Sequence, residues 1–343
     1  MERGCCELSP SKFVCNLRRL NVVRRRSVCT GWITDVPGIN RLVLLDGGLG
    51  QEISLRASRS EPHPLWSIMV MREEPHLVVD VHCEFLEAGA RVLTLNNYAA
   101  TPTRMGNHGM AEDVISTHRQ ANALLDQAIE QSGIPRHTLS KMGCLPPLAA
   151  SYVAEVAPTY ESARIEYAEL IAIQKDHVDG FLVETMSNIA EMRAARDALV
   201  EAGHPVRMGI TLADDRSNRL RSGESLESAL DVLSEGPLEA VMINCSQPES
   251  ILPALDLLKT MGCAYGAYAN GFTTVAPLQP GGTVKDLTQR IDLDPETYAD
   301  HVLTWIDHGA TVIGGCCEIS PQHIAHLHQC LNDRNISVTS FNQ

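Results

Sequence analysis

From residue 41 to the end of the chain, short apolar runs alternate with longer segments that have the apolar spacing of helices. Most of the runs are continuously apolar, as expected of parallel strands that are covered on both faces. Eight strands alternating with helices is the count of a (β/α)8 barrel, the α/β fold that we predict, with an open doubly wound sheet as the alternative. The predicted strands are residues 41–48, 91–98, 141–147, 180–186, 206–212, 240–246, 264–270 and 311–317.

Residues at the predicted helix ends support this repeated unit. Asn188 precedes a helical pattern with Glu191 three positions later, which is typical of a helix N-terminus. A glycine also recurs just before several predicted strands, where a helix would end in a left-handed cap. We expect this conformation at Gly89, Gly180, Gly203, Gly262 and Gly309. No Gly-x-Gly-x-x-Gly follows the first strand, so dinucleotide binding has no local support.

The composition excludes several classes of protein. The formal net charge of −14 over 343 residues leaves no global positive field to hold nucleic acid or an anionic membrane. No apolar run approaches the roughly 20 residues of a transmembrane helix. The eleven cysteines are odd in number and scattered, unlike the disulfide framework of a small secreted domain. We therefore expect a soluble, cytoplasmic protein; its oligomeric state is left open.

Residues 1–40 differ from the rest of the chain. They contain seven basic and three acidic residues, for a net charge of +4, and four of the cysteines. An organelle-targeting peptide is the alternative interpretation, but Glu2, Glu7 and the cysteines argue against it. We predict a disordered basic extension over residues 1–40, followed by one barrel domain over residues 41–343.

Polar or reactive residues gather at the predicted strand ends. In a parallel barrel the carboxyl ends of all strands meet at one face, where the following loops build the active site. The residues expected at this face are Asp46, Asn96, Asn97, Glu184, Thr211, Cys245, Asn270, Cys316 and Cys317.

Three cysteines thus converge on one face, although Cys245 is far from Cys316 and Cys317 in sequence. Zinc accepts thiolate ligands in a tetrahedron, and a catalytic site leaves the fourth position for water or substrate. Gly314 and Gly315 would allow the sharp turn that two adjacent ligands need. Each cysteine alone could be an inert buried residue, and Cys245 could form a redox pair with one of the others. Their conjunction favours the metal site.

The strand-end carboxylates have two interpretations. Glu184 and Asp46 could cap a helix or form a structural ion pair, but at this face they are well placed to hold a substrate ammonium group. His82 and His301 lie within helical patterns, and we expect them to be structural residues with satisfied hydrogen bonds rather than ligands.

Several motifs, in order and spacing, resemble the homocysteine S-methyltransferase family: LLDGGLGQE, LWS, AGARVLTLNNYAATPTRM, GFLVETMSNIAE, INCS and GGCCE. The resemblance covers about residues 41–333. It implies a (β/α)8 barrel that holds one catalytic Zn²⁺ per chain through Cys245, Cys316 and Cys317. It also implies that the metal binds the homocysteine sulfur, which receives a methyl group to give methionine.

The resemblance assigns further residues. Asp46, Gly47 and Glu184 match the positions that help to bind homocysteine, and Gly48 accompanies them. Asn96 and Tyr98 are also expected to contact substrate, and Asn270 to lie on the methyl-donor side. Two departures from the common motifs are Leu95, where many members have threonine, and Ala269, where many have proline.

The methyl donor is expected to be small. Cobalamin and folate versions of this chemistry use additional domains, for which we expect no room in this chain. S-Methylmethionine or S-adenosylmethionine is the favoured donor, and betaine comes second. A zinc-dependent hydrolase and a non-catalytic barrel that binds zinc and thiols are the alternatives.

Overall fold

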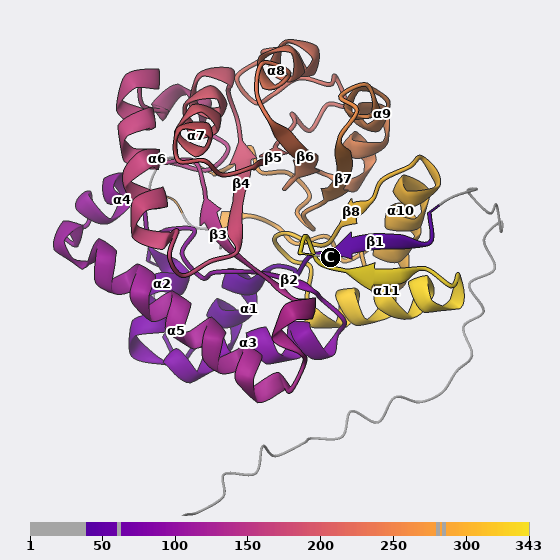
Figure 1. Ribbon diagram of the computed structural model, residues 1–343, viewed down its shortest axis with the longest axis horizontal. Coiled ribbons are helices and arrows are strands. Elements are labelled where there is room, and N and C mark those ends of the chain that lie inside the picture. Colours follow the sequence, from indigo (N-terminus) through magenta and orange to yellow (C-terminus); the bar gives the residue numbers. More distant parts are fainter. Residues whose placement is uncertain (1–38, 60–62, 279–281, 283–285, 343) are drawn as a thin grey trace, which may run out of the picture. The chain divides into compact units, whose positions relative to one another are not determined.

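The computed structural model describes residues 39–59, 63–278, 282 and 286–342. Its strands form one parallel sheet that winds into a nearly closed barrel (Figure 1). The strands are β1 (Arg41–Leu44), β2 (Val92–Thr94), β3 (Ser140–Leu145), β4 (Gly180–Met186), β5 (Val206–Ile210), β6 (Leu238–Asn244), β7 (Ala264–Tyr268), β8 (Val312–Ile313) and β9 (Ser337–Thr339). Their order in the sheet is β2-β3-β4-β5-β6-β7-β8-β1-β9.

The predicted barrel is confirmed, because each of the eight predicted runs overlaps one of the strands β1 to β8. The ninth strand was not predicted; it pairs in parallel with β1, where Arg41 is in register with Ser337. β8 is shorter than predicted and ends at Ile313. The cysteine pair that was placed on this strand therefore lies in the loop beyond it.

The barrel closes between β1 and β2 through few backbone contacts. Leu45 forms an isolated parallel bridge with Val92, and Asp46 N donates to Val92 O at 3.0 Å. One step further, Thr94 N donates to the Asp46 carboxylate (Oδ2) at 2.9 Å. A side chain thus continues the backbone ladder across this seam.

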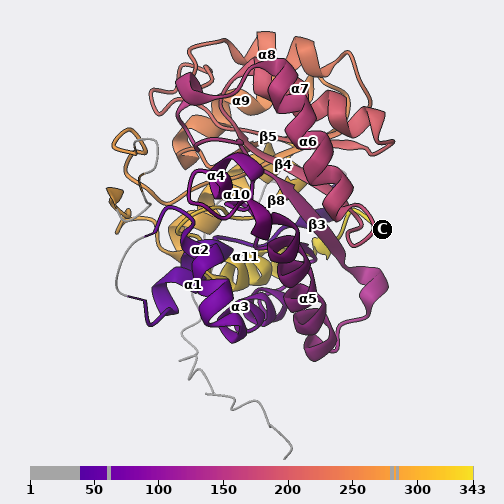
Figure 2. The ribbon, with the colours of Figure 1, turned by 90° about the vertical axis from the view of Figure 1, so that its left-hand side faces the viewer.

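Helices surround the strands in Figure 1, and Figure 2 shows α1, α2 and α3 grouped together, in agreement with their mutual contacts. The α-helices are α1 (Leu49–Arg56), α2 (Trp66–Glu73), α3 (Pro75–Glu87), α4 (Pro102–Gly106), α5 (Val114–Ser132), α6 (Tyr160–Gln174), α7 (Ile189–Glu201), α8 (Leu226–Leu233), α9 (Pro248–Lys259), α10 (Pro295–Asp307) and α11 (Pro321–Asp333). Short 3-10 turns are η1 (Ala111–Asp113), η2 (Arg136–Thr138) and η3 (Ala154–Val156). Among the described residues, none of these helices is long and apolar enough to span a bilayer.

The helix-end predictions hold with one exception. Asn188 caps α7, since its Oδ1 accepts from Glu191 N at 2.8 Å. The glycines at 89, 203, 262 and 309 have positive φ, as predicted. Gly180 does not, because it is the first residue of β4. A Cβ at this position would lie 2.5 Å from Arg207 Nη1, so close approach of that side chain explains the glycine instead.

Apolar side chains fill two regions. A large core lies between the sheet and the helices. A smaller cluster takes one or two residues from each of several strands, which places it inside the barrel. Its buried members are Leu45, Val92, Met142, Leu182, Ala240, Met242, Tyr268 and Val312. The predicted site residues follow at the carboxyl ends of the strands, beyond this inner cluster.

His82 departs from the prediction that it has satisfied hydrogen bonds. Its side chain on α3 is fully buried, and neither ring nitrogen has a hydrogen-bond partner among the described residues. Burial lowers its pKa to about 3. His82 is therefore a neutral core residue whose polar atoms cost stability. His301, by contrast, lies 3.9 Å from Glu249.

Replacing His82 by leucine is expected to raise the free energy of unfolding at pH 7 by about 1–2 kcal/mol, because two unsatisfied buried nitrogens are removed. In the wild type, the unfolded chain takes up a proton on this histidine near pH 6.5, whereas the folded protein does so only near pH 3. Stability should therefore fall as the pH drops from 6.5 towards 3, and His82→Leu should lack this contribution.

Urea unfolding at pH 7 and pH 5 measures both effects. His177→Leu is the matched control, because His177 is exposed. An unchanged pH dependence in His82→Leu would contradict this explanation.

The predicted extension at residues 1–40 falls almost entirely outside the described residues. Its disorder and the domain boundary at residue 40 stay predictions.

Candidate active site

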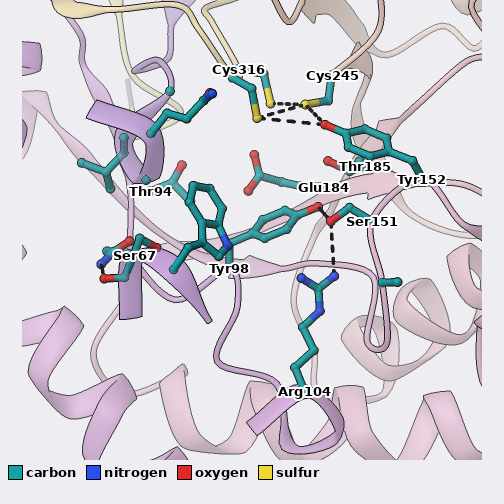
Figure 3. Close-up of a pocket in the computed structure, with 18 of the residues that line it drawn as sticks. Ser67, Thr94, Tyr98, Arg104, Ser151, Tyr152, Glu184, Thr185, Cys245 and Cys316 are labelled. Carbon is teal, nitrogen blue, oxygen red and sulfur yellow. Dashed lines mark hydrogen bonds between the residues drawn. The ribbon is translucent and has the colours of Figure 1, made fainter. Parts of the chain in front are cut away.

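A cavity of about 650 Å³ lies at the carboxyl ends of the barrel strands. Figure 3 shows the labelled cysteines on one side of it, with Glu184 and Tyr98 facing the same space. The lining includes most of the predicted site residues, namely Asp46, Gly47, Gly48, Asn96, Tyr98, Glu184, Cys245, Cys316 and Cys317. Residues from the ends of five separate strands thus share one cavity.

The three predicted cysteines come together. The Sγ atoms of Cys245 and Cys317 are 3.7 Å apart, and those of Cys245 and Cys316 are 2.6 Å apart. All three sulfur atoms lie within 4.8 Å of one another, and the group could hold a metal ion. Within the described part of the chain, it is the one such group of three or more His, Cys, Asp or Glu side chains.

Cys245 owes its position to a left-handed backbone turn directly after β6. Its φ is +46°, which is unfavourable for a residue with a Cβ. Three hydrogen bonds fix the turn: Cys245 N donates to Tyr268 O at 3.0 Å, and Cys245 O accepts from Asn270 Nδ2 at 2.8 Å and Thr211 Oγ1 at 3.1 Å. Asn270 and Thr211 are therefore supports for the cysteine, and neither lines the cavity.

The loop of Cys316 and Cys317 is anchored from both sides. Cys316 N donates to Ala269 O at 2.9 Å. Glu318 has a positive φ of +66°, and its backbone N donates to Gln51 Oε1 at 2.7 Å, while its carboxylate accepts from Gln51 Nε2. A Cβ on Gly48 would lie 2.8 Å from Cys316 O. Gly48, in the turn between β1 and α1, therefore lets the cysteine loop pack closely against that turn.

A tyrosine that the sequence interpretation did not single out contacts the cysteines. The Tyr152 hydroxyl is 2.8 Å from Cys245 Sγ and 4.0 Å from Cys317 Sγ. Although burial opposes ionisation, hydrogen bonds from the other two thiols and from Tyr152 hold the pKa of Cys245 well below its usual value. Donating to the Cys245 sulfur raises the pKa of both Cys316 and Cys317.

Two buried carboxyl groups face the same cavity. Burial, with the charge of Glu184, raises the pKa of Asp46 to about 8, against the hydrogen bond from Thr94. Burial raises the pKa of Glu184 to about 7, opposed by the hydrogen bond that Cys144 Sγ donates to Oε2 at 2.9 Å. A bound cation would favour ionisation of both groups.

Glu184 is aimed by a strained residue. The next residue, Thr185, has a φ of +62°, an outlier for a β-branched side chain. Asn244 holds it in place: Asn244 Oδ1 accepts from Thr185 N at 2.9 Å, and Nδ2 donates to Thr185 Oγ1 at 3.0 Å. Positive φ at Tyr152, Thr185 and Cys245 places backbone strain on the cavity wall.

The remaining predicted residues divide between cavity and scaffold. Asn96 lines the cavity and donates to Ser67 O at 3.2 Å. The Tyr98 hydroxyl lies 2.9 Å from Ser151 Oγ. Asn97 points away, since its amide donates to Gln174 Oε1 at 2.8 Å. Of the two positions that depart from the common motifs, Leu95 lines the cavity, whereas Ala269 contacts the site through its backbone carbonyl, which accepts from Cys316 N.

Three functional candidates were missed: Tyr152, Cys144 and Arg104. Cys144 lies within β3, next to β4, so strand adjacency was the signal that could have paired it with Glu184. Tyr152 lies on the segment after β3, and Arg104 on the segment after β2. No periodic pattern in these segments indicates which way a side chain points.

The model of the family described as Homocysteine S-methyltransferase matches residues 43–331, most of the chain. The chain belongs to the homocysteine S-methyltransferase family. The match includes the three clustered cysteines, Asp46 and Glu184. Membership of the homocysteine S-methyltransferase family places the chain among methyltransferase enzymes.

Related proteins agree with this family. Homocysteine S-methyltransferase 2 from Arabidopsis thaliana is 25% identical over 318 residues, 85% of this chain and 93% of the plant protein. Selenocysteine methyltransferase from Astragalus bisulcatus is 25% identical over 321 residues, with the same two coverages. The crystal structure of the homocysteine methyltransferase MmuM from Escherichia coli, in a metallated form, is 24% identical, with a TM-score of 0.69 over 84% of this chain and 96% of that one. This structural likeness supports the fold of a homocysteine S-methyltransferase.

Proposed function

We propose that this member of the family methylates the sulfur of homocysteine to make methionine, with a small cationic molecule as the methyl donor. The observation that carries the proposal is the meeting of three thiols with two buried carboxyl groups around one cavity of about 650 Å³. The thiols suit a metal that binds sulfur, and the carboxyl groups suit an ammonium group.

The cysteine group fits one Zn²⁺ per chain. Two thiolate ligands of a tetrahedral zinc ion lie about 3.8 Å apart, given Zn–S bonds of about 2.3 Å. The separation of 3.7 Å between the Cys245 and Cys317 sulfur atoms agrees with this spacing. The 2.6 Å between the Cys245 and Cys316 sulfur atoms is shorter, so these two side chains would have to move apart to bind the ion together. Cys245, Cys316 and Cys317 would be the protein ligands. Bound there, the ion would supply the acidity that keeps the substrate sulfur as a thiolate, the nucleophilic form.

The chain's own groups would orient the two substrates. Glu184 and Asp46 would hold the homocysteine ammonium group, and Cys144 would keep the Glu184 carboxylate in place through its 2.9 Å hydrogen bond. Tyr152 would donate to Cys245 Sγ. Cavity walls such as Leu95 would keep water from the reacting atoms.

The reaction needs no oxidant, and no residue of the chain has to act as a base. The homocysteine thiol releases its proton to solvent, and its sulfur forms a bond to the donor methyl carbon. The bond between that carbon and the donor's positively charged sulfur or nitrogen breaks, and its electron pair stays with the donor. We favour S-methylmethionine or S-adenosylmethionine as the donor, with betaine second.

The test is methionine formation by the full-length, reduced, zinc-loaded protein, with each donor offered in turn. Deuterium-labelled homocysteine separates new methionine by mass from methionine that S-methylmethionine releases. We expect labelled methionine with at least one donor. If the protein holds one zinc ion per chain but forms no labelled methionine from any donor, the proposal is contradicted and a non-catalytic thiol-binding barrel is favoured. If it hydrolyses a substrate in the absence of any methyl donor, a zinc hydrolase is favoured.

A further inference from the structure

Arg104 is the one arginine or lysine among the described residues that line the cavity. It lies on α4, and its position is set by Thr101, the N-cap of that helix. Thr101 Oγ1 accepts from Arg104 N at 3.1 Å and donates to Leu148 O at 2.7 Å. These bonds fix the backbone of Arg104 beside the cavity.

The protein satisfies the Arg104 guanidinium only in part. Nη2 donates to Pro147 O at 2.7 Å and to Ser151 Oγ at 3.3 Å, and Cζ lies 5.3 Å from the centre of the Tyr98 ring. Nε is buried without a hydrogen-bond partner in the described ranges, and no ion pair there includes Arg104. Because charged groups in proteins are normally paired when they leave water, this guanidinium has capacity for an anionic ligand.

Arg104 lies at a distance from the cysteine group. In Figure 3, Ser151 and Tyr98 lie between Arg104 and Glu184, and the labelled cysteines lie beyond Glu184. In the proposed function, the homocysteine sulfur is at the cysteines and its ammonium group at Glu184. The homocysteine carboxylate, on the same carbon as that ammonium group, and the carboxylate of the second substrate are then the two anions that compete for Arg104.

We propose that Arg104, together with the Ser151 and Tyr98 hydroxyls, is a carboxylate-binding subsite for the methyl donor; this inference rests on the proposed function. A guanidinium binds a carboxylate through two parallel charge-assisted hydrogen bonds, and the hydroxyls supply neutral donors beside it. The subsite selects donors that are amino acids with a cationic methyl-bearing centre. Their carboxylate is held at Arg104 and their methyl group is directed toward the cysteines.

A structural role for Arg104 predicts a different pattern. Glu191, which is buried, and Glu166, which is half-buried, lie close enough for Arg104 to lower the pKa of each, against the rise caused by burial. If Arg104 served only as their counter-charge, its loss would reduce stability and weaken every donor alike. A carboxylate subsite weakens only donors that carry a carboxylate.

The experiment measures donor binding by calorimetry with the full-length, zinc-loaded protein and without homocysteine, so that no turnover is needed. S-Methylmethionine is compared with its decarboxylated analogue, (3-aminopropyl)dimethylsulfonium. Arg104→Gln is expected to raise the Kd of S-methylmethionine on the order of 10- to 100-fold and to leave the analogue within about twofold. Arg104→Lys, which keeps the charge without the fork, should fall between. Arg164→Gln, at a surface ion pair with Glu201, is the control and should match the wild type.

Three results would overturn the subsite: equal loss for both donors, a loss confined to homocysteine binding, or wild-type protein that binds both sulfonium compounds equally. If Arg104→Gln does not fold, Ser151→Ala gives the same comparison with a smaller expected loss of about 2- to 5-fold for S-methylmethionine. Since binding is the readout, a failure of methyl transfer in the assay of the proposed function leaves this comparison intact.

Discussion

Cys245→Ala is expected to reduce bound zinc from one ion per chain to near zero and methionine formation to background. Structural zinc sites bind with roughly 10–16 kcal/mol, so the loss of one thiolate should weaken binding on the order of 10³-fold or more. The barrel should stay folded, because the Cys245 side chain is small and its backbone hydrogen bonds do not involve the sulfur. Metal analysis after dialysis, circular dichroism and the labelled-homocysteine assay measure the three quantities.

Cys263→Ala is the matched control, since Cys263 is half-buried and does not line the cavity. It should keep full zinc and activity. Cys245→Ala protein that retains one zinc per chain would refute the three-ligand site, whatever its activity.

Glu184→Gln is expected to raise the KM for homocysteine by about 100-fold, because the amide removes the charge that would pair with the ammonium group. The wild type should also bind homocysteine more tightly as the pH rises. Asp46 and Glu184 have raised pKa values, about 8 and about 7, and only their ionised forms attract a cation. The KM for homocysteine should therefore decrease as the pH rises from 6 to 8.5. In Glu184→Gln, most of the decrease around pH 7 should be absent, because the group that ionises there has been removed.

Steady-state rates at saturating donor over this pH range check the prediction. Glu184→Asp, which keeps the charge on a shorter side chain, is the control and should have an intermediate KM. Equal pH profiles in the wild type and Glu184→Gln would show that Glu184 does not bind the ammonium group.

Much of the fold and the centre of the site could be predicted, because both follow from periodic patterns. Alternating apolar runs determine a barrel, and a barrel brings all strand ends to one face. Cys245 and Cys316 could therefore be placed together although they are 71 positions apart in the sequence. The length of β8 could not be predicted, since its apolar run continues through Gly314 and Gly315 after the ladder stops.

The missed residues depend on features without a pattern in the sequence. Cys144 acts on Glu184 only because β3 and β4 are in a particular register. Tyr152 reaches Cys245 through a left-handed backbone conformation at a residue other than glycine. His82 lies on the apolar stripe of α3, and its lack of partners depends on the packing of neighbouring helices. Register, loop conformation and tertiary packing are each set by the whole fold.

The seam between β1 and β2 links the assembly of this protein to its readiness for substrate. The segments of β1 and β2 are joined there by one bridge, two backbone hydrogen bonds (Arg91 N to Leu44 O and Asp46 N to Val92 O), and the Thr94 hydrogen bond to the Asp46 carboxylate. A chain that has paired its other strands but has not yet joined these two would have no fixed orientation for Asp46. Closure of the barrel at this seam therefore also fixes one wall of the cavity, because the same carboxylate that joins the two strands lines it.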